Sequence, residues 1–108
     1  MYGNKMLLIY DIKGNEIYRE QFNGTWYKYE FNDDDNIIHC LYSDGRWNKY
    51  TYDTIGNKIY EEYSSGYWTK HRYNEYGELI YSEDSNGSWW KYKYDDYDNR
   101  IVIATSDD

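Results

Sequence analysis

The sequence lacks several features that would place it in a common class of protein. It has no proline, one cysteine and one alanine among 108 residues. A single cysteine cannot form an internal disulfide, so nothing marks an oxidising compartment. No apolar run approaches the roughly 18 residues of a membrane span, and the stretch from Met6 to Tyr10 is too short for a secretion signal. We therefore expect a cytoplasmic protein that makes no contact with a membrane.

Aromatic residues take the place of the scarce aliphatic ones. Leu, Ile, Val and Phe together number 17 and the net charge is −8, which is typical of disordered chains. However, the 17 Tyr and five Trp can each bury roughly 150–250 Å². With one Ala and four Leu the chain is a poor helix former, whereas Tyr, Trp, Ile and Thr favour strands. The length allows one domain.

An internal repeat dominates the sequence. Displacing the chain by 21 residues superimposes it on itself without insertion, which is the signature of a repeat architecture. Five columns carry the repeat: a glycine, a tryptophan, a lysine, an isoleucine and an aromatic residue that precedes Asp or Asn. They are Gly3, Gly24, Gly45, Gly66 and Gly87; Trp26, Trp47, Trp68 and Trp89; Lys28, Lys49, Lys70 and Lys91; Ile17, Ile38, Ile59, Ile80 and Ile101; and Tyr10, Phe31, Tyr52, Tyr73 and Tyr94.

Each repeat contains two turn signals. One is Asp-x-x-Gly-Asn, as in residues 11–15 and 53–57, and the other is an Asn-Gly, Asp-Gly or Ser-Gly pair before the tryptophan. Both Asn and Gly tolerate positive φ, so these pairs predict hairpins. The aromatic stretches between them have the length of strands. We predict an all-β single domain, an antiparallel meander of about ten strands. It would comprise four hairpin repeats (10–30, 31–51, 52–72 and 73–93) and half repeats at 1–9 and 94–108.

Strand alternation predicts aromatic side chains on both faces of the sheet. Trp26 and Lys28 fall on one face of their strand, and Tyr27 and Tyr29 fall on the other. A flat sheet would leave large apolar patches in water, so we expect a twisted or rolled sheet in which lysine stems cover part of the tryptophan row. The pattern leaves open whether the sheet closes and which face is buried.

Acidic residues concentrate at one edge, because alternate turns of a meander lie at the same edge. Equivalent turns would lie about 10 Å apart, close to the Debye length of about 8 Å, so neighbouring clusters reinforce one another. An alternative is that these acids only keep an aromatic protein soluble. The predicted partner-binding residues are Asp11, Asp33, Asp34, Asp35, Asp53, Glu75, Asp95, Asp96 and Asp98.

The repeat unit resembles the tyrosine-aspartate (YD) repeats of Rhs and teneurin proteins. Those repeats place Tyr-Asp-x-x-Gly, a second Gly ten residues on, and then Tyr-x-Tyr-Asp; Tyr52-Asp53, Gly56, Gly66 and Tyr73-Asn74 match this spacing. The resemblance implies β-hairpin repeats, which in that family build a large shell around a toxin. This chain departs from it in its Trp and Lys columns and in having four repeats, so we expect a short standalone form. A shorter match, Gly24-Thr25-Trp26-Tyr27, is similar to the repeats of cell-wall-binding proteins.

No residue pattern indicates catalysis. His39 and His71 occupy columns that hold Tyr in other repeats, so we expect both at half-buried strand positions. His39 and Cys40 are adjacent on a strand, so they point to opposite faces and cannot form a nucleophile–base pair. Residues 33–36 lack the spaced ligands of a calcium loop. We predict no enzyme activity, no cofactor and no metal.

The charge decides the predicted function. A net charge of −8 disfavours direct binding of nucleic acid and favours a cationic partner. We predict a non-enzymatic inhibitor that occludes the nucleic-acid-binding surface of a host enzyme, such as a phage-encoded, anti-CRISPR-like protein in the bacterial cytoplasm. Two alternatives stay open. One is a glycan-binding module that uses Trp26, Trp47, Trp68 and Trp89. The other is an immunity or scaffold protein that docks by its edge strands, which would also permit an edge-to-edge homodimer.

Overall fold

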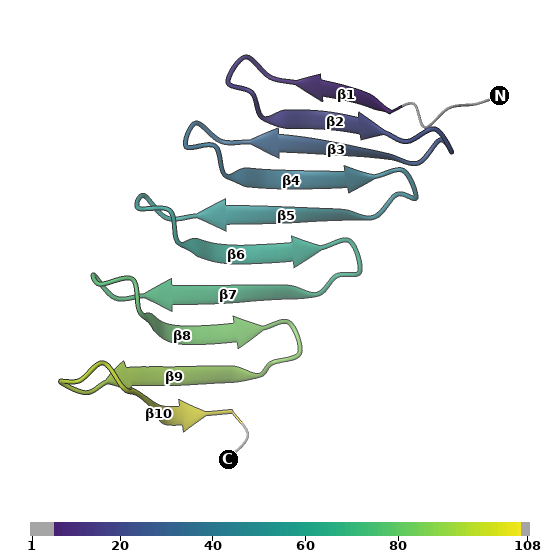
Figure 1. Ribbon diagram of the computed structural model, residues 1–108. Coiled ribbons are helices and arrows are strands. Elements are labelled where there is room, and N and C mark those ends of the chain that lie inside the picture. The colour runs from purple at the N-terminus through teal and green to yellow at the C-terminus, as the bar shows by residue number, and fades with distance from the viewer. Residues whose placement is uncertain (1–5, 107–108) are drawn as a thin grey trace. The chain divides into compact units, whose positions relative to one another are not determined.

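The computed structural model describes residues 6–106, which form strands and turns. Antiparallel strands follow one another in sequence order in a single sheet (Figure 1). This confirms the predicted all-β hairpin meander. The described residues contain no helix that could cross a membrane. The strands are β1 (Leu7–Tyr10), β2 (Glu16–Glu20), β3 (Trp26–Phe31), β4 (Ile37–Tyr42), β5 (Trp47–Tyr52), β6 (Lys58–Tyr63), β7 (Trp68–Tyr73), β8 (Leu79–Asp84), β9 (Trp89–Tyr94) and β10 (Arg100–Thr105).

Both classes of turn close in the same way. In the turn after β5, the Asp53 amide donates to the Asn57 carbonyl at 2.9 Å and the Gly56 amide donates back to the Asp53 carbonyl at 3.2 Å. The turn after β8 repeats this pattern with Gly87 in the fourth position. That position requires a positive φ, which is 99° at Gly56. The repeated glycines therefore mark the left-handed residue of each hairpin turn.

The isoleucine column marks a β-bulge. In the first hairpin Ile9 pairs with Tyr18 but Tyr10 pairs with Glu16, so Ile17 is left without a partner across the strands. The β3–β4 and β7–β8 hairpins shift register at the equivalent residue. In the β9–β10 hairpin the irregularity lies farther along, between Val102 and Ala104. Bulges of this kind bend one strand and increase its local twist.

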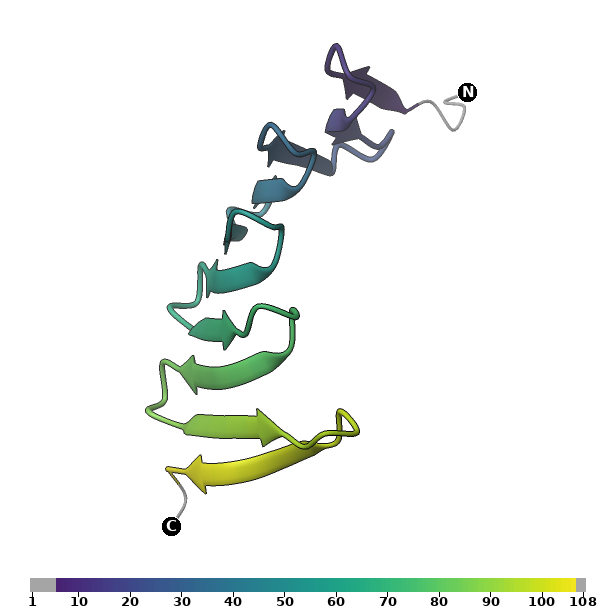
Figure 2. The same ribbon diagram turned by 90° about the vertical axis from the view of Figure 1, so that its left-hand side faces the viewer.

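The chain divides into two compact units. The first comprises residues 6–50 with 63–65, and the second comprises 51–62 with 66–106. Within each unit the strands form one layer, and no second layer of described residues covers it (Figures 1 and 2). Only Cys40 among the hydrophobic side chains of residues 6–106 is fully buried, with 5 % of its surface exposed. Stability within each unit therefore comes from rows of half-buried side chains along the sheet.

The ends of the strand order are β1 and β10, so the sheet is open. Both strands expose apolar side chains, since Leu7 is 51 % and Val102 is 55 % exposed. An exposed apolar edge is a template for pairing with another strand. The edge-to-edge homodimer and the single domain both stay predictions.

Candidate protein-interaction surface

Five turns contain the predicted acidic residues, and we call them the acidic turns: 11–15, 32–36, 53–57, 74–78 and 95–99. The first residue of each turn is Asp or Asn, and its side chain closes the turn. Asp53 Oδ1 accepts the amides of Ile55 at 3.1 Å and Asn57 at 2.8 Å. Asn74 Oδ1 accepts the equivalent amides at 2.9 Å each. The first position therefore needs a side-chain oxygen rather than a charge.

These turn amides also lower the pKa of the aspartates that they contact. The Asn15 amide is the main cause for Asp11, and the Asn99 amide is the main cause for Asp95. Burial raises the pKa of Asp53, but the hydrogen bonds from its turn outweigh that effect and the pKa is lowered. The carboxylates of these three predicted site residues are thus engaged inside their own turns.

The first unit brings two acidic turns into contact. Lys13 Nζ donates to the carbonyl oxygen of Asp33 at 2.8 Å and lies 3.6 Å from the Asp35 carboxylate. Asn15 Nδ2 donates to Asp35 Oδ1 at 2.9 Å. Within residues 6–106, the carboxylates of Asp33 and Asp34 form no ion pair. Asp35 is therefore partly neutralised, while its two neighbours face solvent.

In the second unit, two of the predicted acids, Asp95 and Asp98, line a surface cavity of about 780 Å³. Tyr76, Lys91 and Lys93 also line it, whereas the other predicted acids of this unit (Asp53, Glu75 and Asp96) do not. Asp98 occupies the glycine position of its turn with φ of 64°. No three His, Cys, Asp or Glu side chains of the described residues are placed to share a metal ion.

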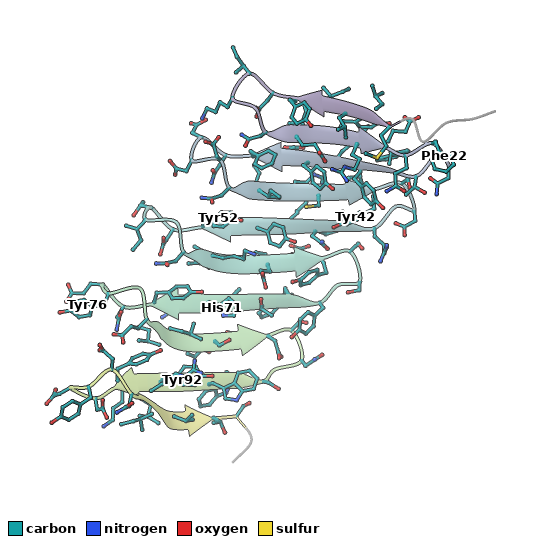
Figure 3. All side chains as sticks on the ribbon, viewed as in Figure 1. Phe22, Tyr42, Tyr52, His71, Tyr76 and Tyr92 are labelled. Carbon is teal, nitrogen blue, oxygen red and sulfur yellow. The ribbon has the colours of Figure 1, made fainter. Side chains whose placement is uncertain are left out.

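Large apolar side chains at the tips of the acidic turns were missed by the sequence reasoning. Ile55, Tyr76 and Tyr97 all occupy the third position of their turns and are 69 %, 79 % and 86 % exposed. Figure 3 shows Tyr76 at its turn, away from the strands, whereas His71 and Tyr92 lie on β7 and β9. The signal in the sequence was a large apolar residue at the second variable position of the Asp-x-x-Gly-Asn turn, where a solvent-facing tip is expected.

The strand register places the tryptophan and lysine columns on one face of each unit. Lys28 pairs with Tyr18 and Trp26 pairs with Glu20 in the first unit, and Lys70 pairs with Tyr60 in the second. The opposite face is rich in tyrosine and contains the buried Cys40. Burial raises the pKa values of Tyr29 and Tyr42 on that face.

Each tryptophan of the predicted ladder is covered by its own lysine. The Nζ atoms lie 4.9 Å from the ring centroids of Trp26, Trp47 and Trp68, and 5.5 Å from that of Trp89. Tyr60 also stacks on Trp68 with a centroid distance of 6.3 Å. These contacts are cation–π and aromatic pairs within the sheet. A sugar ring would have to displace the lysine to stack on the same side of the indole.

The remaining candidates for chemistry lie in structural contacts. His39 pairs with Glu30 and Lys49, whereas Cys40 pairs with Tyr29, so His39 and Cys40 lie on opposite faces as predicted. His71 Nδ1 lies 3.2 Å from the Ser82 hydroxyl.

Two further repeated contacts have a sequence signal at the 21-residue period. Serines follow β4, β6, β8 and β10, and their amides donate to tryptophan carbonyl oxygens at 2.9–3.0 Å. These serines are Ser43, Ser64, Ser85 and Ser106. In the second contact a tyrosine hydroxyl donates to the glutamate two residues later. These pairs are Tyr18–Glu20, Tyr60–Glu62 and Tyr81–Glu83.

Comparison with known proteins shows similarity of fold. No family model matches the chain, and no curated protein matches its sequence. A crystal structure of TcdB2-TccC3-TEV matches 94 % of this chain with a TM-score of 0.75 and 19 % identity, and that of TcdB2-TccC3 matches 94 % with 0.74 and 19 %. The Photorhabdus luminescens Tc holotoxin pore with TccC3-D651A matches 95 % with 0.73 and 19 %.

The chain has the fold of a segment of these Tc toxin chains. It covers 5–6 % of their length. A meander of β-hairpins therefore occurs within much larger toxin chains. Membership of the YD-repeat family stays a prediction, because an identity of 19 % carries the fold alone.

Proposed function

We propose that this chain is a non-enzymatic protein-binding module whose acidic turns bind a partner with a basic surface. The observation that supports it most is the presence of two kinds of carboxylate in these turns. Those in the first position accept turn amides, and Asn32 and Asn74 do this equally well without charge. The closing bonds of the turns do not use the tip carboxylates, so their charge is available to a partner. These tip residues are Asp33, Asp34, Glu75 and Asp96.

The tip carboxylates favour a cationic partner. In the first unit Asp33 and Asp34 lie in a single tip. In the second unit Glu75 and Asp96 lie at the tips of neighbouring acidic turns, and because alternate strands of a sheet are about 10 Å apart, they interact over about one Debye length. Their fields add at that distance, and they attract Lys and Arg side chains of a partner. Such contacts steer association and weaken as salt rises.

The specific form of this proposal is an inhibitor. A protein that presents rows of negative charge could occupy a groove that binds nucleic acid, since such grooves are lined by Lys and Arg. The target would be a nucleic-acid-binding enzyme of a bacterial host, and the chain would act in the cytoplasm as a phage-encoded anti-defence protein of the anti-CRISPR kind. The support for this form is the acidity of the chain and the exposure of its tip carboxylates.

Two variants with equal net charge test the proposal. Asp33→Asn, Asp34→Asn and Asp96→Asn remove three tip charges, whereas Asp11→Asn, Asp53→Asn and Asp95→Asn remove three charges that serve the turns. Each protein is immobilised and exposed to bacterial lysate at about 0.15 M and about 0.5 M salt. Retained proteins are identified by mass spectrometry.

We expect the wild-type protein to retain a basic protein at low salt and release it at high salt. The tip variant should lose that protein, while the first-position variant should retain it. Equal retention by both variants would contradict the proposal, because it would show that position in the turn is irrelevant. Sedimentation of the wild-type protein with cell-wall glycan, and no retained protein, would favour the tryptophan ladder instead.

A further inference from the structure

The three acidic turns of the second unit present a row of large apolar side chains to solvent. Ile55, Tyr76 and Tyr97 are each more than two-thirds exposed. A single exposed apolar side chain is ordinary. Here the three occupy the same position in successive turns of one sheet edge, about 10 Å apart, because two strand spacings separate them. They therefore form a row about 20 Å long.

The fold does not require apolar residues at this position. In the first unit the equivalent residues are Lys13 and Asp34, and their turns close with the same backbone hydrogen bonds. A cation, an anion, an isoleucine and a tyrosine are thus all compatible with this turn. The turn therefore does not explain why these three residues are large and apolar, and we look for the reason in a contact with another molecule.

The charge of the same turns indicates the partner. Turns 53–57, 74–78 and 95–99 contain six carboxylates and no Lys or Arg. We infer that Ile55, Tyr76 and Tyr97 are the anchors of the interface, and that they dock a protein segment in which Lys or Arg side chains flank apolar ones. Tyrosine is enriched among the residues that dominate binding energy, because it buries a large ring at low entropic cost. This inference rests on the proposed function and assigns to it a specific contact row.

Replacement of the anchors by aspartate separates apolar contact from charge. The variant carries Ile55→Asp, Tyr76→Asp and Tyr97→Asp, which copy the residue present at Asp34. Its matched control is Phe22→Ser, which removes an apolar side chain that is 63 % exposed in the turn after β2. The new serine copies Ser43, Ser64, Ser85 and Ser106, which occupy the same position in the later repeats.

The probes are two synthetic lysine-rich peptides, each about ten residues long and long enough to span the row in extended form. One has Leu at every third position and the other has Ser there. Fluorescence anisotropy measures the affinity of each peptide, and amide chemical shifts in NMR spectra locate it.

We expect the Leu peptide to bind the wild-type protein more tightly and to shift the amides of 54–56, 75–77 and 96–98. The aspartate variant should bind the Leu peptide at least about tenfold more weakly, and the Phe22→Ser protein should bind it as the wild type does. Unchanged or tighter binding of the Leu peptide by the aspartate variant overturns the inference alone, since charge would then be sufficient. Failure of both peptides to bind the wild-type protein overturns the proposed function as well.

Discussion

Asn74→Ala should destabilise the protein, whereas Asn74→Asp combined with Glu78→Asn should not. The Asn74 Oδ1 atom accepts the amides of Tyr76 and Glu78 at 2.9 Å, and alanine leaves both amides to water. A net hydrogen bond contributes about 0.5–1.5 kcal/mol, and loss of a comparable helix cap costs about 1 kcal/mol. Two such bonds therefore amount to about 1–2 kcal/mol. In a domain of this size that loss lowers the melting temperature by roughly 5–10 °C.

Glu78→Asn accompanies Asn74→Asp because Asn74 Nδ2 donates to Glu78 Oε1 at 3.0 Å, and two carboxylates at that distance would repel. The double variant should keep the turn because it copies the Asp–Asn pairs of the turns at 53–57 and 95–99. In those turns the aspartate accepts the same two amides, and the asparagine donates to its second carboxylate oxygen. The assay is thermal unfolding at neutral pH, followed by near-ultraviolet circular dichroism of the aromatic residues. Glu75→Ala is the control, since this tip side chain takes no part in closing the turn, and it should melt as the wild type does. An alanine variant at position 74 that melts with the wild type, or a double variant Asn74→Asp with Glu78→Asn that melts with the alanine variant, would refute the assignment of the first position to the fold.

Three further outcomes follow from the same geometry. The pKa values of Asp11 and Asp95 are lowered by turn amides. The stability that these two carboxylates contribute is therefore complete above their pKa in the unfolded chain, and it is lost as pH falls through their lower pKa in the folded chain. Asp11→Asn with Asp95→Asn should flatten the fall in melting temperature between neutral and strongly acidic pH. At Gly77, where φ is 79°, Gly77→Ala should cost about 1 kcal/mol in urea unfolding and Gly77→Asn less, because Asp35 and Asp98 already adopt positive φ at that turn position. Lys70→Met removes the ammonium group that lies 4.9 Å from the Trp68 centroid and should cost about 0.5 kcal/mol with a change in tryptophan fluorescence; an unchanged spectrum would show that the pair does not persist in solution.

Much of the fold could be read from the chain because the signals are local. Turn glycines need positive φ, and aromatic stretches of strand length alternate between two faces, so the hairpins and their order follow from the 21-residue period. The acidic turns follow the odd-numbered strands, so the same period places them at one end of the strands within each unit. The roles of individual acids did not follow, although Asn32 and Asn74 at the first position were a signal that charge there is dispensable.

By itself the sequence determined the repeat, the hairpins, the two aromatic faces and the location of the acidic turns, because each depends on residues within a few positions of one another. Tertiary structure alone decided that the sheet stays open and that bulges form at Ile17, Ile38 and Ile80. It also decided that Lys13 reaches the next acidic turn and that Ile55, Tyr76 and Tyr97 remain in solvent. The bulges depend on the register of each hairpin, and the Lys13 contact joins turns that are 20 residues apart in the sequence. A local pattern specifies neither the register nor such a contact.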